Sequence, residues 1–334
     1  MPKRLILIYL IICISPSLIF SQTLPFTFSP NTPAKAEEVN SNFQFLAKQF
    51  KRNEKTINCP NDNISQAIAD GYNHLIINGT CTFSPLITPW DMPEFKQYGF
   101  TSIHPTTHLT LEGGTNGIID KDPNMPWGML VFAGDLRIKS LKVNQNIYLN
   151  TGSRMNVSYS DLTGISAVQG SAVDIFQSTF NCLPDNSCLY ASGSSYLRAD
   201  NITVNISSEG SYMDVTESSF AEIKNSTFND TSPNPDGRNT FLWIGTNGGV
   251  QFEDTNITIN DADIVVEMGG ILNLNGGQIV RNNGSPTLRV GDRGTFWEYN
   301  DGTIDDIQCD GQYGLIKIDN ASGNVGSISG NCPF

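Results

Sequence analysis

The sequence predicts an all-β chain that winds as a parallel β-coil. From about residue 134 to the end, one template recurs. It consists of two apolar residues separated by one residue, then four mostly small or polar residues, and then a third apolar residue. Seven of the copies begin within a residue of a Gly-Ser, Gly-Gly or Gly-Thr pair. Alternation with period two indicates strands, and the glycines indicate that the chain turns a corner before each one. Only 16% of the residues are charged, which leaves little material for long solvated helices.

The repeat is about 20 residues long. Its copies are Leu136-Ile138-Val143, Met155-Val157-Leu162, Val173-Ile175-Phe180, Met213-Val215-Phe220, Val250-Phe252-Ile257, Leu272-Leu274-Ile279 and Trp297-Tyr299-Ile304, with a weaker one at Ser195, Leu197 and Ile202. One interval of 37 residues is interpreted as two coils, the second being a degenerate copy around Phe241 to Ile244. Such a period is too short for a strand plus a long helix, so each repeat is predicted to be one coil of a β-solenoid.

Residues 1–21 have the pattern of a signal peptide. Lys3 and Arg4 precede an apolar run from Leu5 to Phe20, and Ser21 supplies a small residue at a plausible cleavage site. The run is shorter than the roughly 20 residues that a membrane span needs. We therefore expect a secreted, extracellular or cell-surface protein with no membrane span after cleavage. Loss of the two basic residues changes the net charge from −13 to −15, which argues against nucleic acid as a partner.

Residues 22–57 are predicted to be an extended and then helical assembly segment. Val39, Phe43, Leu46 and Phe50 are spaced four, three and four residues apart, as on one side of a short helix. The stretch from Thr32 to Phe43 resembles one found near the front of bacterial and phage fibre-like proteins, where it is taken for a trimerising coiled coil. That resemblance implies a homotrimer, although so short a seam fits equally well against its own domain.

Residues 58–334 form the predicted solenoid domain. Residues 63–70 can make two helical turns that end at Gly71, and His74 to Gly79 is then a short strand. A small helix at this position would cover the open end of the solenoid.

At the level of pattern, residues 58–334 resemble the right-handed parallel β-helix proteins of the pectin-lyase-like superfamily. The lead-in is similar to that of exported bacterial members, with a cysteine, a helix around Ala67 and Ile68, and the sequence Asn78-Gly79-Thr80-Cys81. The resemblance implies a single-stranded right-handed parallel β-helix with a short N-terminal helix. It does not imply one activity, because lyases, hydrolases, adhesins and phage spikes share this fold.

Six cysteines follow the signal peptide, an even number that favours disulfides in an exported chain. Cys59 and Cys81 are 22 residues apart, and Cys309 and Cys332 are 23 apart, so each pair is separated by about one coil. Neighbouring rungs lie about 4.8 Å apart, within the Cα separation that a disulfide accepts. We predict that these pairs join neighbouring coils at the two ends and that Cys182 and Cys188 close a small loop.

A candidate site follows from the residue between the first two apolar positions of each copy, which should face solvent. This outward row is Arg137, Asn156, Asp174, Tyr196, Asp214, Gln251, Asn273 and Glu298. Asp174 and Asp214 would lie two rungs apart, at roughly 9.6 Å, and such a pair would suit an inverting hydrolase. The candidate binding residues are Asn156, Tyr196, Arg198 and Tyr212. An ordinary solvated face is the alternative interpretation of the row.

The function predicted from these features is that of an adhesin-like binding protein that contacts glycans or another surface. The alternative is a polysaccharide hydrolase or lyase, and the third is a structural fibre or stalk. Arg137-Ile138-Lys139 matches a polygalacturonase-like motif by letters, but no Gly-His-Gly accompanies it. No cofactor is predicted, and calcium at Asp261 to Asp263 or at Asp301 to Asp310 is the alternative.

Overall fold

The computed structural model describes residues 35–42, 53–82, 100–103, 108–120, 129–132, 134–149, 151–182, 187–207, 212–231, 240–260, 262–282, 287–309, 313–318 and 324–331. The chain divides into two compact units, residues 1–52 and 53–334. The second unit therefore starts at Asn53, a few residues before the predicted boundary at 58.

In the first unit, residues 36–42 are helical and include Val39 of the predicted seam. Phe43, Leu46, Phe50 and the predicted signal peptide lie outside the described residues, so the signal peptide and the homotrimer stay predictions. None of the helices in the described ranges is long and apolar enough to cross a membrane.

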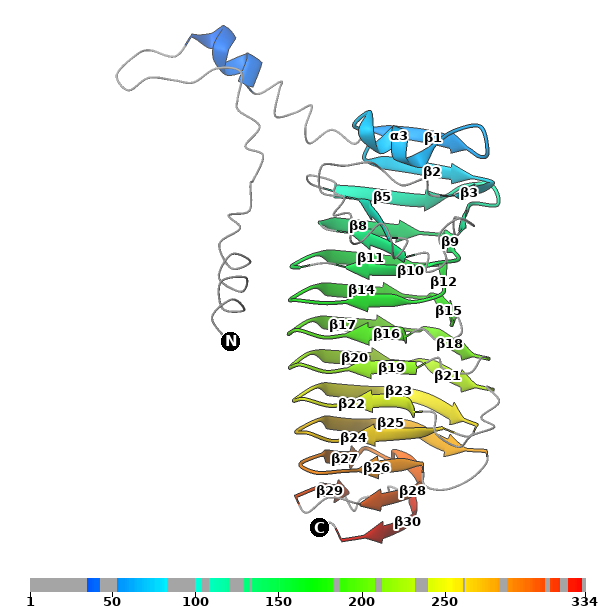
Figure 1. The fold of residues 1–334 in the computed structure, drawn as a ribbon, viewed down its shortest axis with the longest axis vertical. Helices are drawn as coiled ribbons and strands as arrows, with labels where there is room; N and C mark the ends of the chain where they lie inside the picture. Colours follow the sequence, from blue (N-terminus) through cyan, green and yellow to red (C-terminus); the bar gives the residue numbers. More distant parts are fainter. Residues whose placement is uncertain are drawn as a thin grey trace, which may run out of the picture. The chain divides into compact units, whose positions relative to one another are not determined.

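The second unit is a parallel β-helix in which every coil from that of β2 onward adds strands to three stacks (Figure 1). The first stack contains β1 (Glu54–Asn58), β2 (His74–Asn78), β5 (His108–Gly113), β8 (Asp135–Lys139), β11 (Arg154–Ser158), β14 (Ala172–Phe176), β17 (Tyr196–Asp200), β20 (Phe220–Lys224), the first parts of β23 (Gly249–Ile259) and β25 (Ile271–Arg281), β27 (Thr295–Tyr299) and β29 (Leu315–Ile318).

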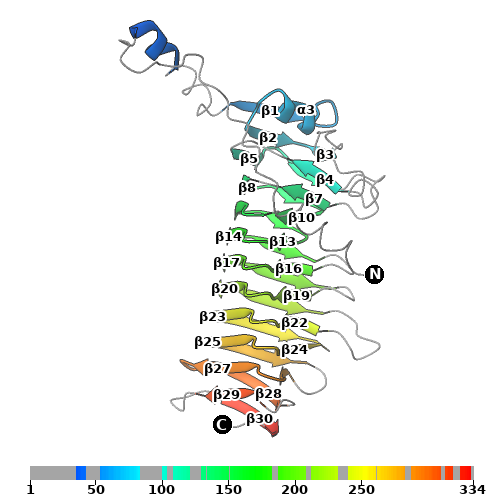
Figure 2. The ribbon, with the colours of Figure 1, turned by 60° about the vertical axis from the view of Figure 1, so that its left-hand side comes forward.

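The second stack contains β3 (Thr80–Thr82), β6 (Ile118–Asp120), β9 (Lys142–Val143), β12 (Asp161–Leu162), β15 (Thr179–Asn181), β18 (Thr203–Ile206), β21 (Thr227–Asp230), the ends of β23 and β25, and the starts of β28 (Thr303–Cys309) and β30 (Asn324–Gly330). The third stack contains β4 (Phe100–Ile103), β7 (Met129–Phe132), β10 (Asn146–Leu149), β13 (Ile165–Ala167), β16 (Ser187–Ala191), β19 (Tyr212–Val215), β22 (Thr240–Ile244), β24 (Asp263–Val266), β26 (Leu288–Val290) and the ends of β28 and β30. Figure 2 shows strands of the third stack, from β10 to β24, one below another.

The corners of the coils explain the polar and glycine-rich composition. Between the first and second stacks, the non-glycine residues with a left-handed backbone have φ between 44° and 66°: Asn116, Ser140, Tyr159, Gln177, Asn201, Asn225, Asp254, Asn300 and Asp301. At the corner before the first stack, Gly170 has φ +79°, a conformation that a side chain would strain. Buried serines at the same corner bond neighbouring coils: the Ser171 amide donates to Ser195 Oγ at 3.2 Å, and the Ser195 amide donates to Ser219 Oγ at 3.0 Å. The corners therefore stack with their buried backbone groups satisfied.

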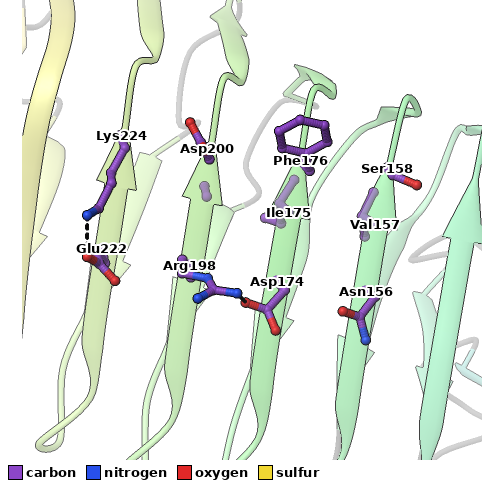
Figure 3. A pocket seen from close by; sticks show the side chains of 11 residues that line it. Asn156, Val157, Ser158, Asp174, Ile175, Phe176, Arg198, Asp200, Glu222 and Lys224 are labelled. Atoms are coloured by element: carbon purple, nitrogen blue, oxygen red, sulfur yellow. Dashed lines mark ion pairs between the residues drawn. The ribbon is translucent and has the colours of Figure 1, made fainter.

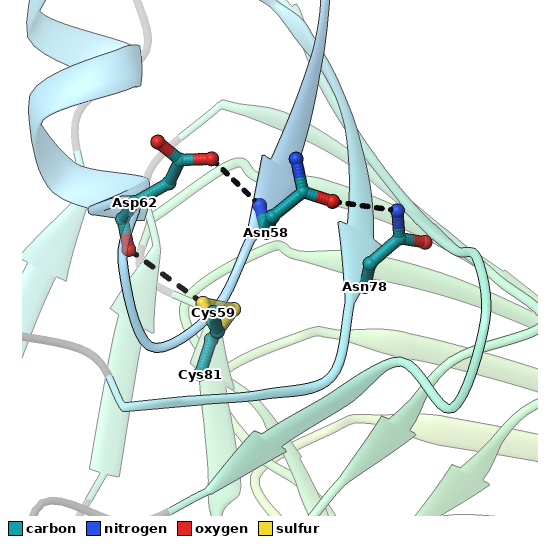
Figure 4. Close-up of a disulfide and its surroundings, with 5 residues drawn as sticks. All are labelled: Asn58, Cys59, Asp62, Asn78 and Cys81. Atoms are coloured by element: carbon teal, nitrogen blue, oxygen red, sulfur yellow. Dashed lines mark hydrogen bonds between the residues drawn. A yellow bond between two sulfur atoms is a disulfide. The ribbon is translucent and has the colours of Figure 1, made fainter.

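The N-terminal end confirms the predicted helix and disulfide. Helix α3 (Ile64–Ala69) starts at Asn63, whose side chain accepts from the amide of Gln66, and it buries Ile64 and Ala67. Cys59 and Cys81 form a disulfide with a Cα separation of 5.2 Å (Figure 4). Beside it, the Asn78 side-chain amide donates to Asn58 Oδ1 at 3.0 Å, which links adjacent coils.

The predicted Cys182–Cys188 disulfide is also confirmed, again with a Cα separation of 5.2 Å. Cys309 is buried. Its predicted partner Cys332 lies outside the described residues, so that pairing stays a prediction.

The predicted phase of the repeat is wrong in four places. The weaker copy at Ser195, Leu197 and Ile202 is displaced by two residues, because Leu197, Ala199 and Val204 are the residues in register with Val173, Ile175 and Phe180. Met213 and Val215 belong to the third stack, and the first-stack copy is instead Ala221-Ile223-Phe228. Phe241 to Ile244 lies in the third-stack strand β22, so the degenerate coil does not exist. In β27, Phe296 and Glu298 are buried while Trp297 is exposed, which places Trp297 on the outward side. These errors arise because small inward residues such as Ala221 are less apolar than the alternating residues of the third stack.

Candidate functional site

A groove crosses four strands on the outer face of the first stack. The register places Asn156, Asp174, Arg198 and Glu222 side by side on β11, β14, β17 and β20 (Figure 3). Two residues further along each strand, a second outward row contains Ser158, Phe176, Asp200 and Lys224. Together these two rows line a groove of about 570 Å³, with Val157, Ile175 and Ala199 from between them. We call it the first-stack groove.

The charged side chains of the first-stack groove hold one another in place. Arg198 Nη2 lies 2.7 Å from Asp174 Oδ1, and Lys224 Nζ lies 2.9 Å from Glu222 Oε1. The Tyr196 hydroxyl, next to the groove, donates to Glu222 Oε2 at 2.6 Å. The hydrogen bonds from Tyr196 and then from Lys224 lower the pKa of Glu222. Burial and then the hydrogen bond to Glu222 raise the pKa of Tyr196 to about 12.

Aromatic side chains lie at both ends of these strands. At the start of β17 and β20, the rings of Tyr196 and Phe220 stack with 6.1 Å between centroids and 8° between planes. At the other end, Phe176 meets Tyr159 edge to face at 5.9 Å. Phe176 and Tyr196 remain 41% and 37% exposed. The polar rows are thus flanked on both sides by accessible aromatic surface.

Three of the predicted site residues come together as expected. Asn156, Asp174 and Arg198 are neighbours in one groove, although Arg198 rather than Tyr196 occupies the row. In the described part of the chain the Asn156 side chain makes no hydrogen bond, so its amide can bind a ligand. Tyr196 lies two residues earlier, in register with Ala172 and Phe220.

The predicted pair of Asp174 and Asp214 is wrong. Asp214 lies in β19 of the third stack, in register with Tyr190 and Trp243, so the two carboxylates are on different faces of the solenoid. Tyr212 is in the same third-stack strand. Glu298, the last predicted member of the row, is buried between Leu274 and Ile318 in the register of the first stack. The phase error explains all three misplacements.

Sequence reasoning missed Glu222, Lys224 and Phe176. Glu222 and Lys224 would have followed from the correct inward residues, because Ala221 and Ile223 place them outward. Phe176 follows Ile175, whose inward position was predicted correctly, and was missed because only one outward residue per strand was considered. The signal was present but weak, since alanine at an inward position looks like a corner residue.

The first-stack groove has the chemistry of a binding site for polar ligands. Its carboxylates have partners: Asp174 pairs with Arg198, Glu222 with Lys224, and Asp200 accepts from the Asn225 side chain at 2.9 Å. Glycoside hydrolysis needs one carboxyl group that stays protonated near neutral pH, whereas the hydrogen bonds from Tyr196 and Lys224 lower the pKa of Glu222 and favour its ionised form. The groove is therefore better suited to binding than to hydrolysis.

The described residues include no cluster of three or more acidic, histidine or cysteine side chains that could hold a metal ion. In the first of the two segments predicted as alternative calcium sites, Asp263 forms ion pairs with Arg281 and Arg289, each at 2.7 Å. Asp261 and Asp310 lie outside the described ranges.

Comparison with family models, with curated proteins and with solved structures gives no match to this chain.

Proposed function

We propose that the first-stack groove binds glycans and that the protein is a secreted or cell-surface, adhesin-like β-helix of the pectin-lyase-like type. The observation that carries the proposal is the combination of two polar rows with accessible aromatic rings on both sides. Sugar rings present apolar C–H faces that pack on aromatic rings. Their hydroxyl groups form strong hydrogen bonds with charged side chains.

The size and charge of the groove narrow the ligand class. The groove crosses four rungs spaced by about 4.8 Å, so its length suits an oligosaccharide rather than a single sugar. Its charged lining residues are Asp174, Asp200, Glu222, Arg198 and Lys224. Acidic groups outnumber basic ones, and every basic group is already paired. Neutral glycans are therefore favoured over chains of acidic sugars.

Glycan-array binding tests the proposal directly. We expect the wild-type chain to bind a set of neutral oligosaccharides, and we expect Arg198→Ala and Phe176→Ala to weaken that binding tenfold or more, equivalent to about 1.4 kcal/mol. Trp297→Ala is the matched control, because Trp297 is as exposed as Phe176 and lies on the same stack far from the groove. Binding that survives both groove substitutions, or that is lost only in the control, would refute the assignment.

An assay of reducing-sugar release on the same glycans separates binding from catalysis. We expect no release by the wild-type chain. Release that disappears in Asp174→Asn would establish the hydrolase alternative, and neither binding nor release would favour a structural fibre or stalk.

A further inference from the structure

The third stack has an outward-facing row of its own, in which large and short side chains alternate. In register on β10, β13, β16, β19 and β22, it contains Tyr148, Ser166, Tyr190, Asp214 and Trp243. A short side chain between two aromatic ones lies below their level. Accordingly Ser166 and Asp214 are only 8% and 7% exposed although they face outward. Burial and then the charge of Tyr190, two rungs away, raise the pKa of Tyr148.

Asp214 lies between Tyr190 and Trp243 in the register of the third stack, and we call this position of a short side chain between two aromatic ones the notch. Its Oδ1 atom is closed to solvent and has no hydrogen-bond partner in the part of the chain that the structure describes. Burial and then the charge of Glu217 raise its pKa to about 6. A buried carboxylate without a partner is costly, so such a group commonly has a function.

The charges around the notch are negative. Glu217 is the charged neighbour of Asp214, and Glu267 accepts a hydrogen bond from Trp243 Nε1 at 3.0 Å. Among the described residues, no lysine, arginine or histidine forms an ion pair with Asp214, Glu217 or Glu267. The electrostatic environment therefore favours a cation from outside the chain.

We propose that this notch binds an organic cation, specifically a quaternary ammonium group, held between Tyr190 and Trp243 above Asp214. These two residues are two rungs apart, roughly 9.6 Å at the backbone. A cation seated above Asp214 would have an aromatic side chain on the rung at either side, and aromatic faces attract cations within about 6 Å. A quaternary ammonium is favoured over a primary amine or a metal cation, because its methyl groups are weakly hydrated and pack against the rings.

This site is independent of the proposed glycan site. The notch lies on the third stack and the groove on the first, and the two share no residue. Failure of one proposal would leave the other standing.

Isothermal titration of the full chain with choline tests the site, with 3,3-dimethylbutan-1-ol as the uncharged ligand of the same shape and with ionic strength held constant. We expect choline to bind at least tenfold more tightly than the alcohol at pH 7.5. Asp214→Asn should abolish that difference, and Asp174→Asn, which removes a carboxylate from the other face, should leave it unchanged. Equal binding of the two ligands, or choline binding that is unaffected in Asp214→Asn, would overturn the proposal.

A second measurement covers the case in which Asp214→Asn fails to fold. In the wild-type chain labelled at its tryptophan side chains, choline should shift the indole resonance of Trp243, identified by its loss in Trp243→Phe. A shift confined to the other tryptophans would overturn the proposal. Phosphocholine should bind more weakly than choline because Glu217 and Glu267 repel the phosphate, which distinguishes a free quaternary amine from a phosphocholine head group. Tighter binding of phosphocholine would contradict the charge argument.

Discussion

The outer faces of the first and third stacks both place carboxylates on parallel strands at the same rung spacing, but the pKa shifts of these carboxylates are opposite in direction. On the first stack, Glu222 is surrounded by donors from Tyr196 and Lys224, and its pKa is lowered. On the third stack, Asp214 has aromatic neighbours above and below, and its pKa is raised. In a solenoid the register determines which side chains lie next to a given residue. It therefore determines whether a carboxylate has hydrogen-bond donors beside it, as Glu222 has, or only aromatic side chains, as Asp214 has.

The carboxylates of the two faces also differ in what they contribute to the stability of the fold. The Arg198–Asp174 pair is about half exposed on both sides, and exposed ion pairs typically contribute at most about 1 kcal/mol. The groove pairs therefore orient side chains for a ligand more than they hold the fold. Asp214, in contrast, lowers the stability of the folded chain whenever it is ionised.

The largest expected effect is on the third stack. The pKa of Asp214 is about 6 in the folded protein against an ordinary value of 3.8, so below pH 3.8 the folded and unfolded chains both hold the proton. As the pH rises from there to about 6, the unfolded chain ionises first and stability falls. The full shift corresponds to about 3 kcal/mol.

Asp214→Asn should therefore raise the free energy of unfolding at pH 7.5 by about 1 to 3 kcal/mol and flatten its dependence on pH between about 4 and 6. Denaturant unfolding across this range measures both effects. Asp174→Asn is the control and should lower the free energy of unfolding by at most about 1 kcal/mol, because it removes only the exposed pair with Arg198. A destabilised Asp214→Asn variant at pH 7.5 would show that the carboxylate has a stabilising partner in the folded chain.

An intermediate effect is expected on the first stack. Lys224→Met removes one of the two donors to Glu222, so the pKa of Glu222 should rise towards its ordinary value. Carboxyl-carbon NMR titration follows this group directly. Lys139→Met, which removes one partner of Glu112 on a more N-terminal part of the same stack, should leave Glu222 unchanged. An unmoved Glu222 in Lys224→Met would mean that Tyr196 alone sets its ionisation.

The sequence predicts the solenoid, the coil length, helix α3 and two disulfides, because these follow from period-two alternation, glycine corners and cysteine spacing. It also places Asn156 and Asp174 together correctly, since the coils from Leu136 to Phe180 have uniform length. The predicted phase is wrong in the next two first-stack strands, β17 and β20, correct again in β23 and β25, and wrong once more in β27. Two first-stack strands have alanine inward, at Ala199 and Ala221, while Met213 and Val215 of the third stack alternate just as well.

The unusual environment of Asp214 could not have been predicted from the sequence. It depends on Tyr190 and Trp243, which lie 24 and 29 residues away and become neighbours only through coils of unequal length. Local alternation shows that a residue faces outward, but the neighbours of that residue follow from the register of other coils.

The smallest expected effect is the coupling between Arg198 and Asp174. A double-mutant cycle with Arg198→Met and Asp174→Asn should give a coupling energy of at most about 1 kcal/mol, falling further in high salt. Thermal or denaturant unfolding of the four proteins provides the cycle. A coupling well above this limit would assign the pair a structural rather than a recognition role.

The central claim, that the first-stack groove binds the glycan, is tested most directly by hydroxyl-radical footprinting of the chain with and without its tightest-binding oligosaccharide. Phe176 and Tyr196 flank the groove and are 41% and 37% exposed, while Trp297 and Tyr313 are 41% and 67% exposed near the C-terminal coils. We expect the oligosaccharide to protect Phe176 and Tyr196 and to leave Trp297 and Tyr313 as reactive as before. Protection of Trp297 or Tyr313, with Phe176 and Tyr196 unchanged, would contradict the account.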